Sequence, residues 1–263
     1  METKKKFEIK RLLTATNILM IILVIFYLLD CYLPLPEGYT GYTPLSDDMP
    51  PAMRYIFGNC GGLLTNYLGH GVILDPSGTQ IYRRITQMFM HGGLLHLIAN
   101  LVGLYFIGNY AEKRFGWWLA YIIYFIVGFC ETYITDSIYI AISTPEQVEL
   151  FNSTPSCGAS GGIFGLMGAS LAAIFFDIKS IKKIGKPTLI VSAVYGISVT
   201  YIVSFGYSTV CHNVAFVLGL LVGTLIILPF FILKKGKFSP ENKTSEPKPK
   251  SVEEQMLENN KND

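Results

Sequence analysis

Charged residues are scarce in this chain. Only 15% of its 263 residues are Asp, Glu, Lys or Arg, whereas soluble domains average about 25%. The formal net charge is +2, and no segment gathers the basic face that a nucleic-acid-binding protein needs. This composition argues against a disordered protein, a disulfide-stapled secreted domain, an ordinary soluble enzyme and a nucleic-acid partner.

Paired cysteines and metal-binding motifs are also missing. Five cysteines lie singly along the chain, at Cys31, Cys60, Cys130, Cys157 and Cys211. An odd, scattered set without a C-x-x-C pair favours packing residues over a disulfide framework or a zinc site. The chain has four histidines without neighbouring carboxylates and no HEXXH motif. We therefore expect no metal and no cofactor.

Long apolar runs dominate the sequence instead. Hydrophobic residues make up 51% of the chain, and the mean hydropathy is +0.40. A bilayer-crossing helix needs about 20 mostly apolar residues. Six segments qualify, at about 13–33, 91–111, 117–134, 158–176, 187–205 and 209–233. They predict an all-α polytopic membrane protein with six transmembrane helices.

The first span follows a basic stretch, as a signal peptide would. Its apolar run is too long for a signal peptide, however, and no small-residue cleavage site follows it, so we expect an uncleaved anchor. Of the 21 Lys and Arg residues, 18 fall on one side of the predicted spans and three on the other. Because cytoplasmic loops collect positive charge, both termini are predicted to be cytoplasmic, in a multi-pass protein of the cell membrane.

Four segments complete this predicted organisation. They are a basic cytoplasmic tail at 1–12, a membrane domain at 13–234, a long outer loop within it at 34–90, and a cytoplasmic tail at 235–263. The last segment is rich in Lys, Glu, Asn and Pro and almost free of apolar residues. That composition is typical of disorder.

Polar side chains occur near the start of three spans that enter from the outer side. His96 and Asn100, four residues apart in the second span, share one helical face. Ser160 lies in the first turn of the fourth span and His212 about one turn into the sixth. At 1.5 Å per residue, all four lie within roughly the outer third to half of the membrane. Ionisable and polar groups at this depth are functional candidates.

These four side chains are the set that a serine hydrolase uses. Serine attacks a carbonyl carbon while histidine takes its proton, and asparagine, histidine and backbone N–H groups can stabilise the oxyanion. The nearest carboxylate that precedes His212 along the chain is Asp177, and none lies close to this histidine in the sequence. A Ser–His dyad is therefore favoured over a triad.

Small residues recur at about four-residue spacing in the two predicted helices that carry Ser160 and His212. They are Gly161 and Gly165, followed by Gly168, in the fourth span, and Ala215, Gly219 and Gly223 in the sixth. Small faces let membrane helices approach closely and would bring Ser160 within reach of His212. The alternative interpretation is that these faces only pack the helices.

Three stretches, taken in order, resemble the signature of the rhomboid family of intramembrane serine proteases. They are H-x-x-x-x-H-x-x-x-N from His91 to Asn100, G-x-S-G from Gly158 to Gly161, and His212 followed by Ala215 and Gly219. The family usually has glycine at the position of Ala215. A weaker match is Tyr82-Arg83, where the family usually has Trp-Arg. The resemblance covers about Tyr82 to Gly223.

The resemblance implies a mechanism and a class of substrate. Ser160 is expected to be the nucleophile and His212 the general base, while His96 and Asn100, with the Ser160 backbone N–H, form the oxyanion site. The expected reaction is cleavage of transmembrane segments of other membrane proteins near the outer face, through an acyl-enzyme. Expected partners are such substrates and the lipid bilayer.

The resemblance also implies supporting residues. Phe164, where the family usually has Tyr, is expected to pack on the His212 ring. Gly158 and Gly161 are expected to support the backbone on either side of Ser160. His91 is expected to be structural and not catalytic. Arg83 is expected to hold the outer loop, although a plain snorkelling arginine is an equal alternative.

Two other classes of function compete with the protease. A non-catalytic, rhomboid-like pseudoenzyme would bind transmembrane clients with the same fold, and the intact Ser160 and His212 argue against it. A small transporter or channel would also carry buried polar residues, but the ionisable groups of this chain gather near one face and do not form a full path.

Overall fold

The computed structural model describes residues 14–33, 68–69, 80–152, 156–176, 185–203 and 206–233. The predicted tails at 1–12 and 235–263, and most of the predicted outer loop at 34–90, lie outside the described residues. All elements assigned in the described part are helical. The prediction of an all-α protein is confirmed for this part.

Four helical segments are long and apolar enough to cross a membrane. They are α2 (Ala15–Tyr32), the run of α6 (Leu94–Gly103), η2 (Leu104–Gly108) and α7 (Asn109–Phe115), then α8 (Trp117–Ile142) and α12 (Tyr207–Leu233). Their apolar faces confirm a membrane protein.

The other two predicted spans are shorter helices. The fourth is α10 (Ser160–Phe176), which has 17 residues. The fifth consists of α11 (Lys186–Ile197), which continues as the π-helix η4 (Ser198–Val203). Three short helices complete the described part, α5 (Arg83–Thr86), η1 (Gln87–Phe89) and α9 (Pro145–Asn152). The count of six membrane spans therefore stays a prediction.

The largest difference from the predicted boundaries is at α8. The sequence predicted a span ending near residue 134, but the helix continues to Ile142. Polar residues in its last turns are buried, and their side chains find partners inside the protein, as Thr135 does with Glu131. Internal partners remove the cost of burying these groups, so the helix does not need to end where the apolar run ends.

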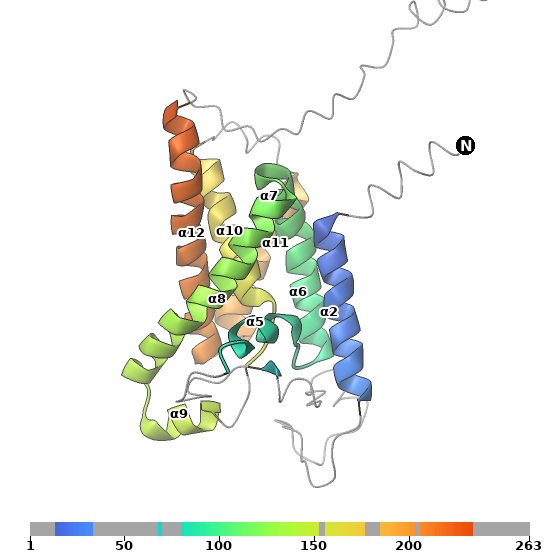
Figure 1. Ribbon diagram of the computed structural model, residues 1–263, viewed down its shortest axis with the longest axis vertical. Helices are drawn as coiled ribbons and strands as arrows, with labels where there is room; N and C mark the ends of the chain where they lie inside the picture. Colours follow the sequence, from blue (N-terminus) through green and yellow to red (C-terminus); the bar gives the residue numbers. More distant parts are fainter. Residues whose placement is uncertain are drawn as a thin grey trace, which may run out of the picture.

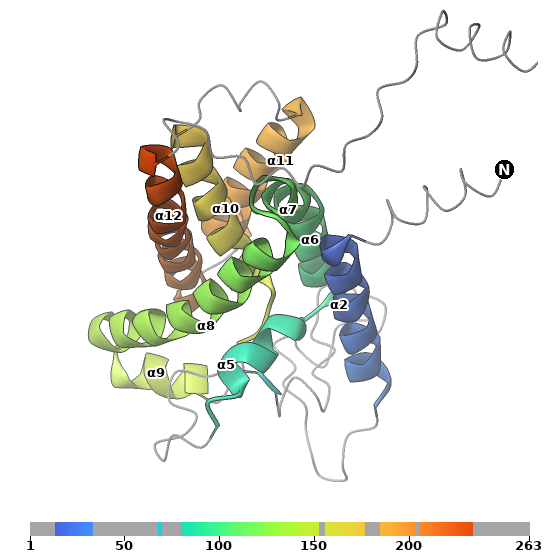
Figure 2. The ribbon, with the colours of Figure 1, turned by 45° about the horizontal axis from the view of Figure 1, so that its top comes forward.

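The helices form one bundle with two distinct ends (Figure 1). Helix α2 begins and α12 finishes at one end, whereas α5 and α9 lie at the other, which we call the α5/α9 end. Helices α6, α10 and α12 all begin toward this α5/α9 end. Figure 2 shows α8 running obliquely across the bundle to α9. Helix α10 packs most extensively against α12, and both contact α8.

Glycines allow α10 and α12 to touch backbone to backbone. A Cβ atom on Gly219 would run into the carbonyl of Gly165, and one on Gly168 would run into the carbonyl of Phe216. Small residues at such crossings are how helices pack closely inside a membrane. The contact sets the spacing of the two helices that carry Ser160 and His212.

A carboxylate of α7 caps the start of α2. The two carboxylate oxygens of Glu112 accept hydrogen bonds from the backbone N–H groups of Ala15 at 3.2 Å and Thr16 at 3.0 Å, and from the Thr16 hydroxyl at 2.8 Å. The first N–H groups of a helix have no partner within it and carry partial positive charge, so an anion there is stabilising. This cap joins the first helix to the rest of the bundle.

Candidate active site

Ser160 and His212 meet between α10 and α12. Ser160 is the first residue of α10 and His212 lies in the second turn of α12. The Ser160 Oγ and His212 Nε2 atoms are 2.9 Å apart, and both residues are buried. This is hydrogen-bonding distance, which a general base needs to take the hydroxyl proton.

The ring of Phe164 lies against the His212 imidazole. The two rings are stacked, with centroids 4.6 Å apart and planes 13° from parallel. Phe164 stands one helical turn after Ser160, so the same face of α10 presents the hydroxyl and the aromatic ring. The imidazole is therefore restrained both by the hydrogen bond at its edge and by the contact on its face.

The Asn100 side chain makes two hydrogen bonds and keeps one N–H donor for a ligand. Its Nδ2 atom donates to the carbonyl of His96 at 3.0 Å, and its Oδ1 atom accepts a hydrogen bond from the Tyr195 hydroxyl at 3.0 Å. Asn100 is buried. A primary amide carries two N–H donors, and one of them is used here, so the second can serve a ligand.

The backbone before Ser160 comes very close to His96. Gly158 has φ +141°, a conformation that residues with a side chain rarely adopt, and a Cβ there would lie 2.8 Å from His96 Nε2. Only glycine satisfies both conditions. The N–H of Gly158 donates to the carbonyl of Gln87 at 3.0 Å, which ties this segment to η1.

His91 packs against His96. It is buried just before α6, and its ring meets the His96 ring edge to face, with centroids 5.1 Å apart. Its ring is thus packed against a histidine that lines the cavity.

One cavity of about 670 Å³ joins these groups, and Ser160, His212, His96 and Asn100 all line it. Its wall thus contains a hydroxyl, two imidazoles and an amide, in a bundle whose outside is apolar. A cavity of this size with several polar groups in its wall has room for water as well as part of a ligand. Hydrolysis requires such a supply of water.

Sequence reasoning missed a carboxyl group in the same cavity. Glu131 of α8 is buried and lines the cavity, and its Oε2 atom accepts a hydrogen bond from Thr135 at 3.0 Å. A Cβ on Gly161 would lie 2.9 Å from Glu131 Oε1, so Gly161 leaves the space that this side chain occupies. The available signal was an ionisable residue inside a predicted span.

Arg83 contacts a residue that precedes α5 along the chain. Its Nη1 atom donates to the carbonyl of Gly69 at 3.1 Å. Within the described residues, no cluster of three or more His, Cys, Asp or Glu side chains could hold a metal ion.

A family model described as "Rhomboid domain" matches residues 78–231, more than half of the chain. The matched range contains every side chain of the site. It also contains all described helices except α2 and the last residues of α12.

Named relatives differ in what their names say about activity. RHOMBOID-like protein 7 of Arabidopsis thaliana is 27% identical over 149 residues, which are 57% of this chain and 44% of the relative. Inactive RHOMBOID-like protein 8 of the same plant is 34% identical over 36% of this chain and 24% of its own. Rhomboid-like protease 2 of Toxoplasma gondii is 27% identical over 55% of this chain and 47% of its own. The matches span less than half the length of these relatives.

Proposed function

The chain belongs to the rhomboid family, and on that premise we propose that it is an intramembrane serine endopeptidase. Its proposed substrates are membrane proteins, which it cleaves within a transmembrane segment near the outer face of the bilayer. The single observation that carries the proposal is the 2.9 Å contact between Ser160 Oγ and His212 Nε2 in the wall of the cavity.

The proposed chemistry proceeds in two steps. His212 takes the proton of the Ser160 hydroxyl as Oγ attacks the scissile carbonyl carbon, and then donates that proton to the departing amine. The result is an ester between Ser160 and the first product. A water molecule in the cavity, activated by His212, hydrolyses this ester and regenerates the serine.

The proposed oxyanion site is formed by three groups. They are the second N–H of the Asn100 amide, the His96 ring and the backbone N–H of Ser160, the first residue of α10. Donors already oriented before the reaction stabilise the negative charge that develops on the carbonyl oxygen without further reorganisation. Tyr195 supports this arrangement because its hydroxyl orients the Asn100 amide.

The substrate class follows from the location of the site. A transmembrane helix ties up its backbone carbonyls in hydrogen bonds, so cleavage requires local unwinding. Gly, Pro or polar residues near one end of the substrate helix would favour it. We place the α5/α9 end at the outer face because 18 of the 21 Lys and Arg residues fall on the opposite side of six proposed spans.

In this topology residues 13–234 form the membrane domain and both tails are cytoplasmic. We propose the cell membrane as its location. The described part agrees with this arrangement, because the start of α2 and the finish of α12 lie at the same end of the bundle (Figure 1).

The second candidate function is that of a non-catalytic binder of transmembrane clients. It is favoured by one observation, namely that a relative 34% identical over 95 residues carries the name "Inactive RHOMBOID-like protein 8". In such a protein the cavity would hold an unwound client segment without cleaving it. The contact between the serine and the histidine favours the protease.

Cleavage of a reporter in liposomes distinguishes the two functions. The reporter is a single-span protein with Gly and Ser near the outer end of its helix. We expect the wild type to cleave it, and Ser160→Ala and His212→Ala to leave it intact. Ser170→Ala is the matched control, because Ser170 is also a buried serine of α10 but does not line the site cavity. A folded wild type that binds such reporters but cleaves none would identify the non-catalytic binder.

A further inference from the structure

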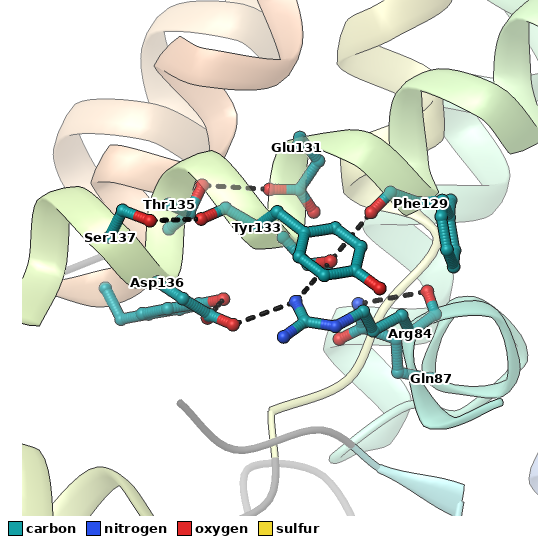
Figure 3. Close-up of polar contacts among 10 residues, drawn as sticks. Arg84, Gln87, Phe129, Glu131, Tyr133, Thr135, Asp136 and Ser137 are labelled. Atoms are coloured by element: carbon teal, nitrogen blue, oxygen red, sulfur yellow. Dashed lines mark hydrogen bonds and ion pairs between the residues drawn. The ribbon is translucent and has the colours of Figure 1, made fainter. Parts of the chain in front are cut away.

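An ion pair between the buried Asp136 and the largely buried Arg84 joins α5 to α8 at the α5/α9 end of the bundle. The Nη1 atom of Arg84 lies 2.8 Å from Asp136 Oδ2 and also donates to Thr132 Oγ1 at 2.8 Å. The Arg84 guanidinium carbon sits 3.8 Å from the centroid of the Tyr133 ring. Figure 3 shows the guanidinium between the Asp136 carboxylate and this ring. Three groups of α8 thus restrain one arginine of α5.

The second oxygen of Asp136 reaches the helix that carries His212. The Tyr207 hydroxyl donates to Asp136 Oδ1 at 2.8 Å, and Tyr207 is buried. Tyr207 is the first residue of α12 and lines the same cavity as Ser160. Asp136 therefore connects a residue of α5 to the start of α12, and we call these three side chains the Arg84–Asp136–Tyr207 network.

Stability alone is a poor explanation for such a network. Removing two charges from water costs several kcal/mol per ion, and a well-packed apolar replacement of a buried pair is often neutral or stabilising. The ion pair instead fixes the relative positions of its partners, because a carboxylate that is bonded through both oxygens holds two groups in one geometry. Apolar packing would not orient the two partners in this way, because the hydrophobic effect is non-directional.

The position of His212 shows what this geometry can control. Beyond His212, α12 is held by the backbone contact between Gly219 and Gly165. His212 is the sixth residue of α12, and the first turns of a helix fray most easily. On the other side of His212, the Tyr207 hydroxyl binds Asp136 of α8 at 2.8 Å, and the Thr209 hydroxyl donates to the Thr200 carbonyl of η4 at 3.3 Å. The imidazole thus lies between attachments on both sides, of which the bond from Tyr207 is the shorter on this side.

We propose that Arg84, Asp136 and Tyr207 are positioning residues, which hold the start of α12 so that His212 stays in hydrogen-bonding contact with Ser160. This inference rests on the proposed protease function and deepens it. None of the three side chains takes part in the bond changes. Their effect reaches the reaction through the distance between the hydroxyl and the imidazole, and a misplacement of about 1 Å can cost up to a hundredfold in rate.

The test compares two tyrosine-to-phenylalanine variants on the liposome reporter. Tyr207→Phe removes the hydroxyl that donates to Asp136, and we expect kcat to fall about tenfold or more with KM unchanged. Tyr133→Phe is the matched control, because it keeps the ring on which Arg84 stacks, and we expect it to have the kcat of the wild type. Fluorophosphonate labelling of Ser160 should slow in the same proportion as kcat.

A second variant shows whether activity is lost because His212 is displaced or because the protein unfolds. The double change Arg84→Met with Asp136→Leu replaces the ion pair by apolar side chains and leaves the buried Tyr207 hydroxyl without its acceptor. We therefore expect a folded protein whose melting temperature falls only by the loss of this one hydrogen bond. The Tyr207 hydroxyl then has no carboxylate to bind, and kcat should stay as low as in Tyr207→Phe.

Two results would overturn the inference. One is an unchanged kcat in Tyr207→Phe, and the other is full activity of the double variant. Either result with an active wild type leaves the protease proposal standing and removes only the positioning role. A wild type that cleaves nothing overturns both proposals.

Discussion

At the scale of single residues, the Asn100 side chain is the group whose removal tests the proposed oxyanion site. Its amide has one N–H on the His96 carbonyl and a second for a ligand. We predict that Asn100→Ala lowers kcat about a hundredfold, because removing one oxyanion donor costs about 10²–10³ in rate. The measurement is steady-state cleavage of the liposome reporter.

Asn109→Ala is the control for this prediction. Asn109 lies in the same predicted span, and its Nδ2 atom also donates to the carbonyl four residues earlier, that of Tyr105. This bond is exposed, however, and Asn109 does not line the site cavity. A general effect of losing such a bond would lower kcat in both variants. Equal rates in Asn100→Ala and the wild type would contradict the oxyanion role.

The residues of the proposed site could be named from the sequence because their spacing is local. Helical periodicity places His96 and Asn100 on one face, and a glycine-rich helix start surrounds Ser160. The parts contributed by other helices could not be found this way. Glu131 is far from His212 along the chain, and only the crossing of α8 with α10 and α12 brings it to the same cavity.

At the scale of elements, the contact between α10 and α12 is the tightest in the bundle. We predict that Gly219→Ala destabilises the protein by about 1–3 kcal/mol, because the new methyl group would have to displace the Gly165 carbonyl. Thermal unfolding in detergent micelles measures this change. The activity should fall as well, because the two helices carry Ser160 and His212.

The control for the helix contact is Gly185→Ala. A Cβ at Gly185 would meet only the ring of Pro187, at 3.7 Å, so we expect a melting temperature close to that of the wild type. An unchanged melting temperature in Gly219→Ala would mean that α10 and α12 do not pack in this way.

The cap on α2 gives a second prediction for an element. Glu112→Gln removes a negative charge that faces the N-terminus of α2, and we expect a loss of about 1 kcal/mol in the free energy of unfolding. Glu149→Gln, an exposed residue of α9 beyond its first turn, is the control and should unfold like the wild type. The measurement is the midpoint of thermal unfolding, and equal midpoints for both variants would exclude the cap as a source of stability.

The sequence located the helices better than their internal form. Apolar runs of the right length predicted the position of all six segments to within a few residues, except at the far end of α8. The π-helical turns of η2 and η4 gave no sequence signal. An extra residue in a helical turn depends on which neighbours the helix packs against, and one chain segment does not contain that information.

At the scale of the whole molecule, the account requires both termini on the cytoplasmic side. We predict that epitope tags at the two ends are protected from external protease in right-side-out vesicles and digested in inverted ones. The reason is the concentration of Lys and Arg on one side of the proposed spans. Digestion of only one of the two tags in right-side-out vesicles would mean an odd number of spans.

The proposed nucleophile is tested most directly by the mass of the covalent product formed with a fluorophosphonate probe. We predict a single adduct on the peptide that contains Ser160, because this hydroxyl has a general base at 2.9 Å. The adduct should disappear in His212→Ala, which keeps the serine but removes the base. An adduct on a different serine, or none on the folded wild type, would contradict the account.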